Sequence, residues 1–207
     1  MDLMIFDCDG TLVDSEFLCN LAMERQLATQ GIEHKAEDLI RQFRGVNLNL
    51  IIESIEIERK VQMPSDFEIE YRKKVSELFD QQLKANQGVV ELLESLTIPY
   101  CVASSGPKHK IKQALKVTGL DKYFGDNIFS SYDINSWKPD PGVFLFAAEA
   151  MKVKAERCCV IEDSIVGLKA ANAANMTSVY YAPEVTDKQT LASIQVQHMS
   201  ELIGKFD

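Results

Sequence analysis

The chain has 207 residues, of which 46% are hydrophobic and 26% charged, and its formal net charge at pH 7 is −9. This composition is typical of a globular protein that is long enough for one substantial domain with an insertion. The negative charge argues against nucleic acid or an anionic membrane as a partner, and no apolar run approaches the roughly 20 residues of a membrane span. Because the sequence starts directly with a predicted strand and shows no signal peptide, we expect a cytoplasmic protein.

The five cysteines form neither a CxxC pair nor a metal-ligand spacing; they are Cys8, Cys19, Cys101, Cys158 and Cys159. Their number is odd and four of them lie in apolar, strand-like runs, which favours free buried thiols in a reducing compartment. Cys8 lies between two aspartates, but the strand pattern already accounts for it, so we predict no redox role.

The first predicted element is a buried strand at residues 3–6. It ends in Asp7 and Asp9, which we expect to share one side of the strand, and Gly10 and Thr11 follow them. Buried carboxylates at a strand end are costly unless a cation or hydrogen bonds compensate, and a hard divalent cation takes oxygen ligands. From these residues alone, a metal site and a simple turn after a strand are both open.

An EF-hand loop also begins with this aspartate spacing, but it requires glycine at its sixth position and glutamate at its twelfth. This chain has Leu12 and Leu18 at those positions, and a strand precedes the pair. The EF-hand interpretation is therefore excluded.

Residues 15 to about 85 show helical patterns and little strand character. Ile51, Ile52 and Ile55 form one apolar helical face, and a second runs from Tyr71 to Gln82. Pro64 separates the two patterns, with Ser65 or Asp66 as the expected N-cap of the second helix.

Four further short apolar strands are predicted, at residues 100–103, 127–130, 158–161 and 178–181. Helical patterns at 108–118, 141–152 and 164–174 separate most of them. Alternation of strands and helices predicts a doubly wound α/β fold with a parallel sheet that is buried on both faces.

Polar motifs follow three of these strands. Ser104 and Ser105 stand before Gly106 and Pro107, where hydroxyls and backbone N–H groups suit a phosphate, although an ordinary turn is the alternative. Lys138 lies in the run Trp-Lys-Pro-Asp-Pro, just before a helix that can start at Pro141. Its charge can neutralise a carboxylate or a phosphate.

The last motif is Glu162 and Asp163, an acidic pair at the end of the strand 158–161, followed by Ser164 and Gly167. Asp163 or Ser164 could simply cap the helix that follows.

These four motifs, in this order, resemble the haloacid dehalogenase superfamily, and the stretch 12–16 resembles its subgroup of β-phosphoglucomutase and small sugar-phosphate phosphatases. The resemblance covers essentially the whole chain. It implies a Rossmann-like α/β core at residues 1–14 and 86–207, with an inserted α-helical cap at residues 15–85.

The resemblance also implies a Mg²⁺-dependent phosphatase and the role of each motif. Asp7 is then the nucleophile that forms an aspartyl-phosphate, and Asp9 is the general acid and base. Ser104, Ser105 and Lys138 bind the phosphate. Asp7, the Asp9 backbone carbonyl and Asp163 hold the Mg²⁺, and Glu162 is either a further ligand or lies just behind the ligands.

The substrate implied is a small phosphomonoester, and the runs 104–108 and 130–141 most resemble the 6-phosphogluconate phosphatases of the subgroup. We therefore expect a sugar phosphate or a sugar-acid phosphate as substrate. We also expect a monomer or a small homo-oligomer, without nucleic-acid or membrane partners. Arg44 lies where related enzymes contact substrate from the cap, although a solvent-facing arginine is equally compatible with the sequence.

Three alternatives have different sequence requirements. A β-phosphoglucomutase would share all four motifs, but it uses a basic residue in the cap near position 48, which here is Leu48. A non-catalytic relative would usually lack one of the acidic motif residues, all of which this chain retains. The halide-releasing branch works without metal and lacks the second aspartate.

Overall fold

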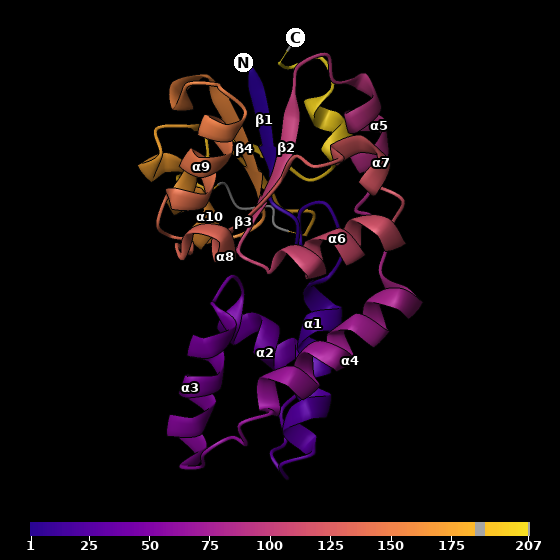
Figure 1. Ribbon diagram of the computed structural model, residues 1–207, viewed down its shortest axis with the longest axis vertical. Coiled ribbons are helices and arrows are strands. Elements are labelled where there is room, and N and C mark those ends of the chain that lie inside the picture. The colour runs from indigo at the N-terminus through magenta and orange to yellow at the C-terminus, as the bar shows by residue number, and fades with distance from the viewer. Residues whose placement is uncertain (185–188, 207) are drawn as a thin grey trace. The chain divides into compact units, whose positions relative to one another are not determined.

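The computed structural model describes residues 1–184 and 189–206, and the chain divides into two compact units (Figure 1). The first consists of Met1–Asp14 and Lys84–Asp207, and the second of Ser15–Leu83. The segment predicted as a cap starts at the same residue as the second unit and ends two residues after it. That this unit covers a substrate remains a prediction.

Within its described residues, the first unit holds a six-stranded sheet in the order β3-β2-β1-β4-β5-β6, in which all neighbouring strands are parallel. The strands are β1 (Leu3–Phe6), β2 (Tyr100–Ser104), β3 (Ile128–Ser130), β4 (Cys158–Glu162), β5 (Thr177–Tyr181) and β6 (Ile194–Val196). This confirms the doubly wound α/β fold. The sequence missed β6, because Gln195 separates its two apolar residues and the segment lacks the apolar run that marks the other strands.

Helices connect the strands, and three of them match the predicted patterns at 108–118, 141–152 and 164–174. The α-helices of this unit are α5 (Val89–Ser95), α6 (Lys108–Val117), α7 (Asp121–Phe124), α8 (Ser131–Ile134), α9 (Gly142–Ala150) and α10 (Ile165–Ala173), and two short 3₁₀ helices are η1 (Ala155–Arg157) and η2 (Met199–Leu202). No helix in the described parts of the chain is long and apolar enough to span a membrane.

The two faces of the sheet are covered by different helices. Leu3 and Ile5 of β1 belong to a core cluster with apolar residues of α9 and α10, and these helices lie together on one side in Figure 1. Phe6 points to the other face, where its ring meets those of Tyr100 and Phe124 edge to face, at 6.4 and 6.1 Å between centroids. Burial of both faces explains why the strands are continuous apolar runs.

The second unit consists of four helices, α1 (Glu16–Ala28), α2 (Ala36–Phe43), α3 (Leu48–Arg59) and α4 (Phe67–Gln82). Helix α1 packs against both α2 and α4. The apolar core between the helices consists of Met23, Leu27, Ile32, Leu39, Phe43, Ile55 and Phe67. Asp66 is the N-cap residue of α4, although its side chain makes no cap hydrogen bond. Arg44 follows α2 and is exposed.

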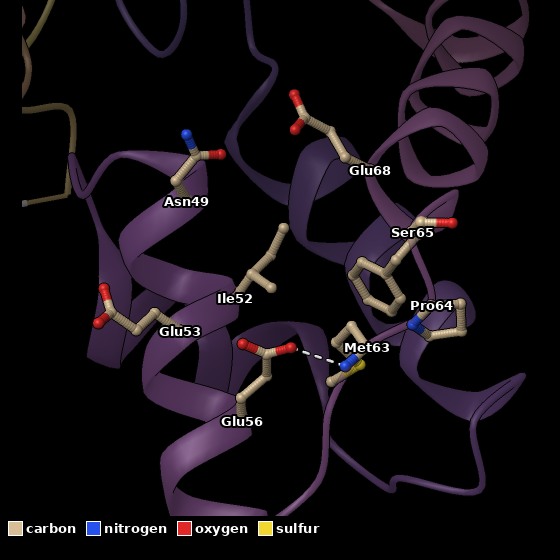
Figure 2. Close-up of a pocket in the computed structure, with 9 residues that line it drawn as sticks. Asn49, Ile52, Glu53, Glu56, Met63, Pro64, Ser65 and Glu68 are labelled. Carbon is tan, nitrogen blue, oxygen red and sulfur yellow. Dashed lines mark hydrogen bonds between the residues drawn. The ribbon is translucent and has the colours of Figure 1, made fainter.

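A pocket of about 240 Å³ lies within the second unit, between α3 and the segment that leads into α4 (Figure 2). Its polar lining includes Glu53, Glu56 and Glu68, and Glu56 accepts a hydrogen bond from the backbone N–H of Met63 at 2.6 Å. Glu68 is paired with Arg72 in the next turn of α4, so at least two of the three lining carboxylates already have partners within this unit.

The packing of α9 on the sheet gives a testable prediction. Phe144 is fully buried in the core cluster, so Phe144→Ala should lower the free energy of unfolding by about 3–5 kcal/mol, as for other large-to-small core changes. Leu145→Ala is the matched control, because Leu145 is the next residue of the same helix and is 41% exposed. Urea unfolding measures both variants, and an equal loss for Leu145→Ala would contradict the assigned burial.

Candidate active site

The parallel direction of the strands brings the polar motifs together at one edge of the sheet. β1 lies between β2 and β4, which is where the strand order reverses, and doubly wound sheets bind ligands at the carboxyl ends of strands around such a point. Asp7 directly follows β1, Ser104 ends β2 and Glu162 ends β4. The switch point of this sheet therefore carries the residues that the sequence singled out.

A buried lysine joins two of the carboxylates. Lys138 Nζ lies 2.5 Å from Asp7 Oδ1 and 2.5 Å from Glu162 Oε1, and the three side chains are at most 8% exposed. Lys138 Nζ also lies 4.8 Å from the centroid of the Phe144 ring. The lysine thus joins Asp7, which follows β1, to the acidic motif at the end of β4.

The charges of this group are strongly coupled. Burial raises the pKa of Asp7 to about 7, with Lys138 opposing the shift and the Glu162 carboxylate adding to it. Burial by itself would lower the pKa of Lys138, but the Asp7 and Glu162 carboxylates outweigh it and the net shift is upward. Lys138 therefore stays charged. The positive charge of Lys138 does not fully offset the effect of burial on Asp7, so the ionised form of Asp7 is only partly stabilised.

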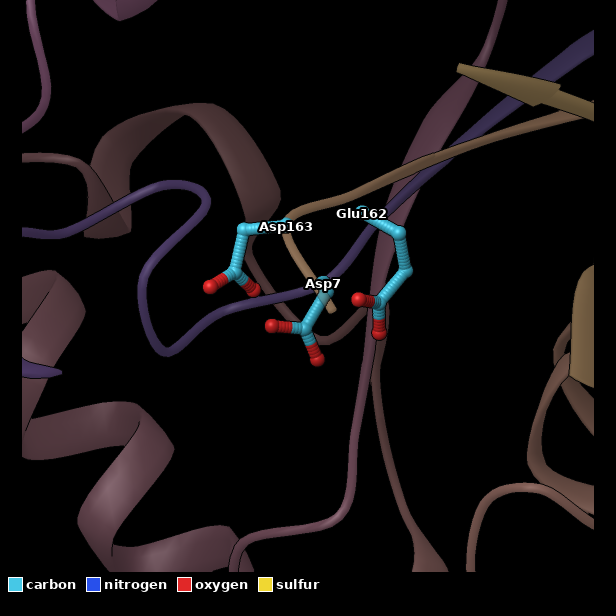
Figure 3. Close-up of side chains that lie close together, drawn as sticks. All are labelled: Asp7, Glu162 and Asp163. Carbon is cyan, nitrogen blue, oxygen red and sulfur yellow. The ribbon is translucent and has the colours of Figure 1, made fainter. Parts of the chain in front are cut away.

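Three buried carboxylates gather at this point (Figure 3). One oxygen from each of Asp7, Glu162 and Asp163 lies within 4.8 Å of the others. Lys138 pairs with Asp7 and Glu162, and a hard divalent cation, which prefers oxygen ligands, fits the carboxylate donor atoms gathered here.

The three carboxylates differ in their other contacts. Glu162 Oε1 accepts from Lys138, and its Oε2 accepts from the backbone N–H and the hydroxyl of Ser164, at 2.9 and 2.8 Å. Asp163 Oδ1 accepts from the Thr11 hydroxyl at 3.3 Å. Both oxygens of the Glu162 carboxylate are thus engaged by groups of the protein, Lys138 on one side and Ser164 on the other.

Asp9 lies in the loop after β1 and has a different partner. Its Oδ2 accepts a hydrogen bond from Lys110 Nζ at 2.8 Å. β1 ends at Phe6, so both aspartates lie in the chain that follows the strand. Each carboxylate has a lysine partner, Lys138 for Asp7 and Lys110 for Asp9.

Gly10 makes this loop possible. Its φ of +78° is unfavourable for residues with a side chain, and a Cβ atom there would overlap the Asp163 carboxylate. Asn86, which is distant in sequence, also stabilises the loop. Its Nδ2 donates to the carbonyls of Gly10 and Thr11 at 2.9 and 2.8 Å.

Ser104 is 1% exposed and accepts a hydrogen bond from Gly106, which is itself held by Ser130. The Gly106 N–H donates to Ser104 Oγ at 3.1 Å, and the Ser130 hydroxyl donates to the Gly106 carbonyl at 2.7 Å. With its oxygen accepting from Gly106, the Ser104 hydroxyl can donate its own proton to a ligand. Ser105 follows in the bend and is half-buried.

The sequence analysis assigned no supporting role to Thr11, Asn86, Lys110 or Ser130. Asn86 and Lys110 act on loop residues that lie 76 and 101 positions away in the chain. Only Thr11 had a local signal, since it directly follows the aspartates and Gly10.

All five cysteines are free, as predicted. Burial raises the pKa of the Cys8 thiol well above its ordinary value, and the nearby Asp9 and Asp7 carboxylates add to the shift. A thiol with a raised pKa is a poor nucleophile, which agrees with the absence of a redox role.

Comparison with known proteins identifies the family. The model of the haloacid dehalogenase-like hydrolases matches residues 4–181. The 6-phosphogluconate phosphatase of Escherichia coli is 38% identical over 189 residues, which cover 91% of this chain and 86% of that protein. A phosphorylated carbohydrates phosphatase of Thermotoga maritima is 33% identical over 187 residues, covering 87% and 84%.

A solved structure agrees with these relatives. The HAD family hydrolase of Deinococcus radiodurans, which has bound phosphate and sodium, is 25% identical and has a TM-score of 0.77, covering 98% of this chain and 93% of that one. The chain therefore belongs to the haloacid dehalogenase-like hydrolases. Within that family, its curated relatives identify it as a phosphatase.

Gly167 gives a test of how tightly the Glu162 carboxylate is held. A Cβ atom at this position in α10 would overlap that carboxylate. Alanine usually stabilises a helix interior relative to glycine by up to about 1 kcal/mol, but we expect Gly167→Ala to destabilise this protein by about 1–3 kcal/mol through overpacking.

Urea unfolding measures the effect, and Lys169→Ala, at an exposed position of the same helix, is the control. A Gly167→Ala variant as stable as the wild type would contradict the position of Glu162.

Proposed function

We propose that this chain is a Mg²⁺-dependent phosphatase that hydrolyses a small phosphorylated sugar or sugar acid, such as 6-phosphogluconate, through an aspartyl-phosphate on Asp7. The observation that carries the proposal is the buried Asp7 carboxylate, paired with Lys138 at the switch point of the sheet. A carboxylate in this position can act as a nucleophile, and the cations around it can receive a phosphate.

In the first step, an Asp7 oxygen attacks phosphorus and the bond between phosphorus and the ester oxygen breaks. Asp9 gives its proton to the departing alkoxide, so the alcohol leaves uncharged. In the second step, water attacks the phosphoryl group on Asp7 while Asp9 takes a proton from that water. Inorganic phosphate leaves, and both aspartates return to their starting states.

Ser104, Ser105 and Lys138 are the proposed phosphate-binding groups. The Ser104 hydroxyl donates to one phosphoryl oxygen, and the backbone turn that begins at Ser105 adds N–H donors. Lys138 is held at 2.5 Å from both Asp7 and Glu162, so its ammonium group already stands beside the attacking oxygen. No rearrangement of the lysine is then needed when phosphate arrives.

Asp7, Asp163 and the backbone carbonyl of Asp9 would hold Mg²⁺. This assignment is supported by the cluster of buried carboxylates and by the extensive use of Glu162 within the protein. When bound, Mg²⁺ neutralises the repulsion between carboxylate and phosphate and stabilises charge on the transferring group.

The substrate class rests on the relatives. The Escherichia coli relative is a 6-phosphogluconate phosphatase and the Thermotoga maritima relative acts on phosphorylated carbohydrates. A β-phosphoglucomutase activity is the alternative, and Leu48 at the start of α3 argues against it, because a second phosphate would call for a basic side chain.

The nucleophile assignment predicts the effect of removing one charge. Asp7→Asn should lower turnover at least about 10³-fold, because the amide cannot form the acyl phosphate, while the fold is retained. Asp126→Asn, at an exposed position, is the control and should keep full activity. Substantial turnover by Asp7→Asn with normal circular dichroism would refute the assignment.

The function itself is tested by phosphate release from a panel of sugar phosphates, sugar-acid phosphates, nucleotides and p-nitrophenyl phosphate, with Mg²⁺ and with EDTA. We expect release only with Mg²⁺, fastest on 6-phosphogluconate or a close analogue. Conversion of β-glucose 1-phosphate to glucose 6-phosphate without free phosphate would instead make the protein a mutase.

A further inference from the structure

Lys110 is a charged residue of the site to which the four motifs assign no role. Its Nζ donates to Asp9 Oδ2 at 2.8 Å, and the two side chains are 19% and 29% exposed. The contact joins the first turn of α6 to the loop after β1, although the two residues are 101 positions apart in the sequence.

The turn that ends β2 fixes the starting point of the lysine side chain. The backbone N–H of Lys110 donates to the Pro107 carbonyl at 2.9 Å, and Pro107 is the N-cap residue of α6. Lys110 is therefore carried by the same turn that carries the phosphate-binding Ser104. A shift of this turn would move both residues.

Gly106 lies where these groups meet. A Cβ atom at Gly106 would stand 3.5 Å from Asp9 Oδ2, 3.5 Å from Ser104 Oγ and 3.8 Å from Lys110 Cδ. The Asp9 carboxylate, the Ser104 hydroxyl and the stem of Lys110 thus border the same small volume. This location distinguishes the pair from an ordinary surface ion pair.

Each of the two lysines of the site forms an ion pair with a different aspartate of the loop after β1. Lys138 is bound to Asp7 and Glu162, whereas Lys110 is bound to Asp9. An aspartate side chain in a loop has several rotamers, and proton transfer requires its oxygen to lie within hydrogen-bond reach of the ester oxygen. A charged hydrogen bond to one carboxylate oxygen restricts this rotation and so limits the positions of both oxygens.

We propose that Lys110 is a positioning residue that orients the Asp9 carboxylate for proton transfer to the leaving group. The proposal rests on the role of Asp9 in the proposed function. It adds that proton transfer depends on a residue of α6, outside the segment after β1 that carries the two aspartates.

The leaving group makes this role measurable. A sugar alkoxide is a strong base and needs a proton as it departs, so its release depends on a well-oriented Asp9. A p-nitrophenolate is a weak base and departs without one. Loss of the orienting contact should therefore slow the hydrolysis of sugar phosphates and leave p-nitrophenyl phosphate hydrolysis nearly unchanged.

The experiment compares Lys110→Met and Lys110→Arg with the wild type, in the full-length protein with Mg²⁺, on the best sugar phosphate and on p-nitrophenyl phosphate. We expect Lys110→Met to lower kcat on the sugar phosphate by about 10- to 100-fold, part of the usual contribution of general acid catalysis. The change in KM should be small, and the change in kcat on p-nitrophenyl phosphate should be below about threefold. Lys110→Arg should recover part of the loss, and the exposed Lys112→Met on the same helix should show none.

A second comparison tests whether the effect passes through Asp9. In an Asp9→Asn background, adding Lys110→Met should lower kcat on the sugar phosphate no further, because the residue it orients is gone. A further loss of similar size, or a rise in KM in both backgrounds, would make Lys110 a direct substrate contact and overturn the proposal.

Other outcomes also decide the matter. Equal losses on both substrates would indicate general damage to the site, and no loss on either would show that Asp9 needs no such support; each overturns the role of Lys110 while leaving the phosphatase function intact. A wild type that hydrolyses neither substrate would overturn the proposed function, and the role of Lys110 with it.

Discussion

The site depends on one buried ammonium group. Lys138 lies 2.5 Å from Asp7 and from Glu162 in a region that water scarcely reaches, and without it two carboxylates would face each other with little compensation. Because burying these charges is costly, neighbouring groups contact each of them. Ser164 donates two hydrogen bonds to the second oxygen of Glu162, and Lys138 Nζ lies over the ring of Phe144. The same contacts that stabilise the buried charges hold Asp7, the proposed nucleophile, beside a cation.

The sheet explains why these groups meet at all. Every strand pair is parallel, so all carboxyl ends lie along one edge, and the order of the strands puts β1 between β2 and β4. The motifs at residues 104 and 162 then lie on either side of residue 7, although 97 and 155 positions separate them from it in sequence. Close packing on both faces restricts movement of the strands. The backbone therefore does not shift to compensate when a polar residue at a strand end is substituted.

The two aspartates after β1 have different environments because the chain turns between them. Gly10 adopts a positive φ that lets the loop fold back toward Asp163, and Asn86 holds the carbonyls of that loop. One carboxylate is thereby fully buried with Lys138, and the other is partly exposed with Lys110. Two chemically identical side chains can then serve as a nucleophile and as a proton carrier, since roles of this kind follow from the surroundings.

The sequence by itself determined the fold class, five of the strands, the helices that follow them, the family and the positions of the polar motifs, because apolar periodicity and short motifs are local properties of the chain. It could not determine β6, because Gln195 separates the two apolar residues of that strand and leaves no apolar run. Whether Glu162 serves the metal or Lys138 was also open in sequence, and its hydrogen bonds to Lys138 and Ser164 favour the second role. The contacts of Lys110, Asn86 and Ser130 were decided only by the tertiary structure, because each joins segments that are distant in sequence and meet only when the parallel sheet has formed.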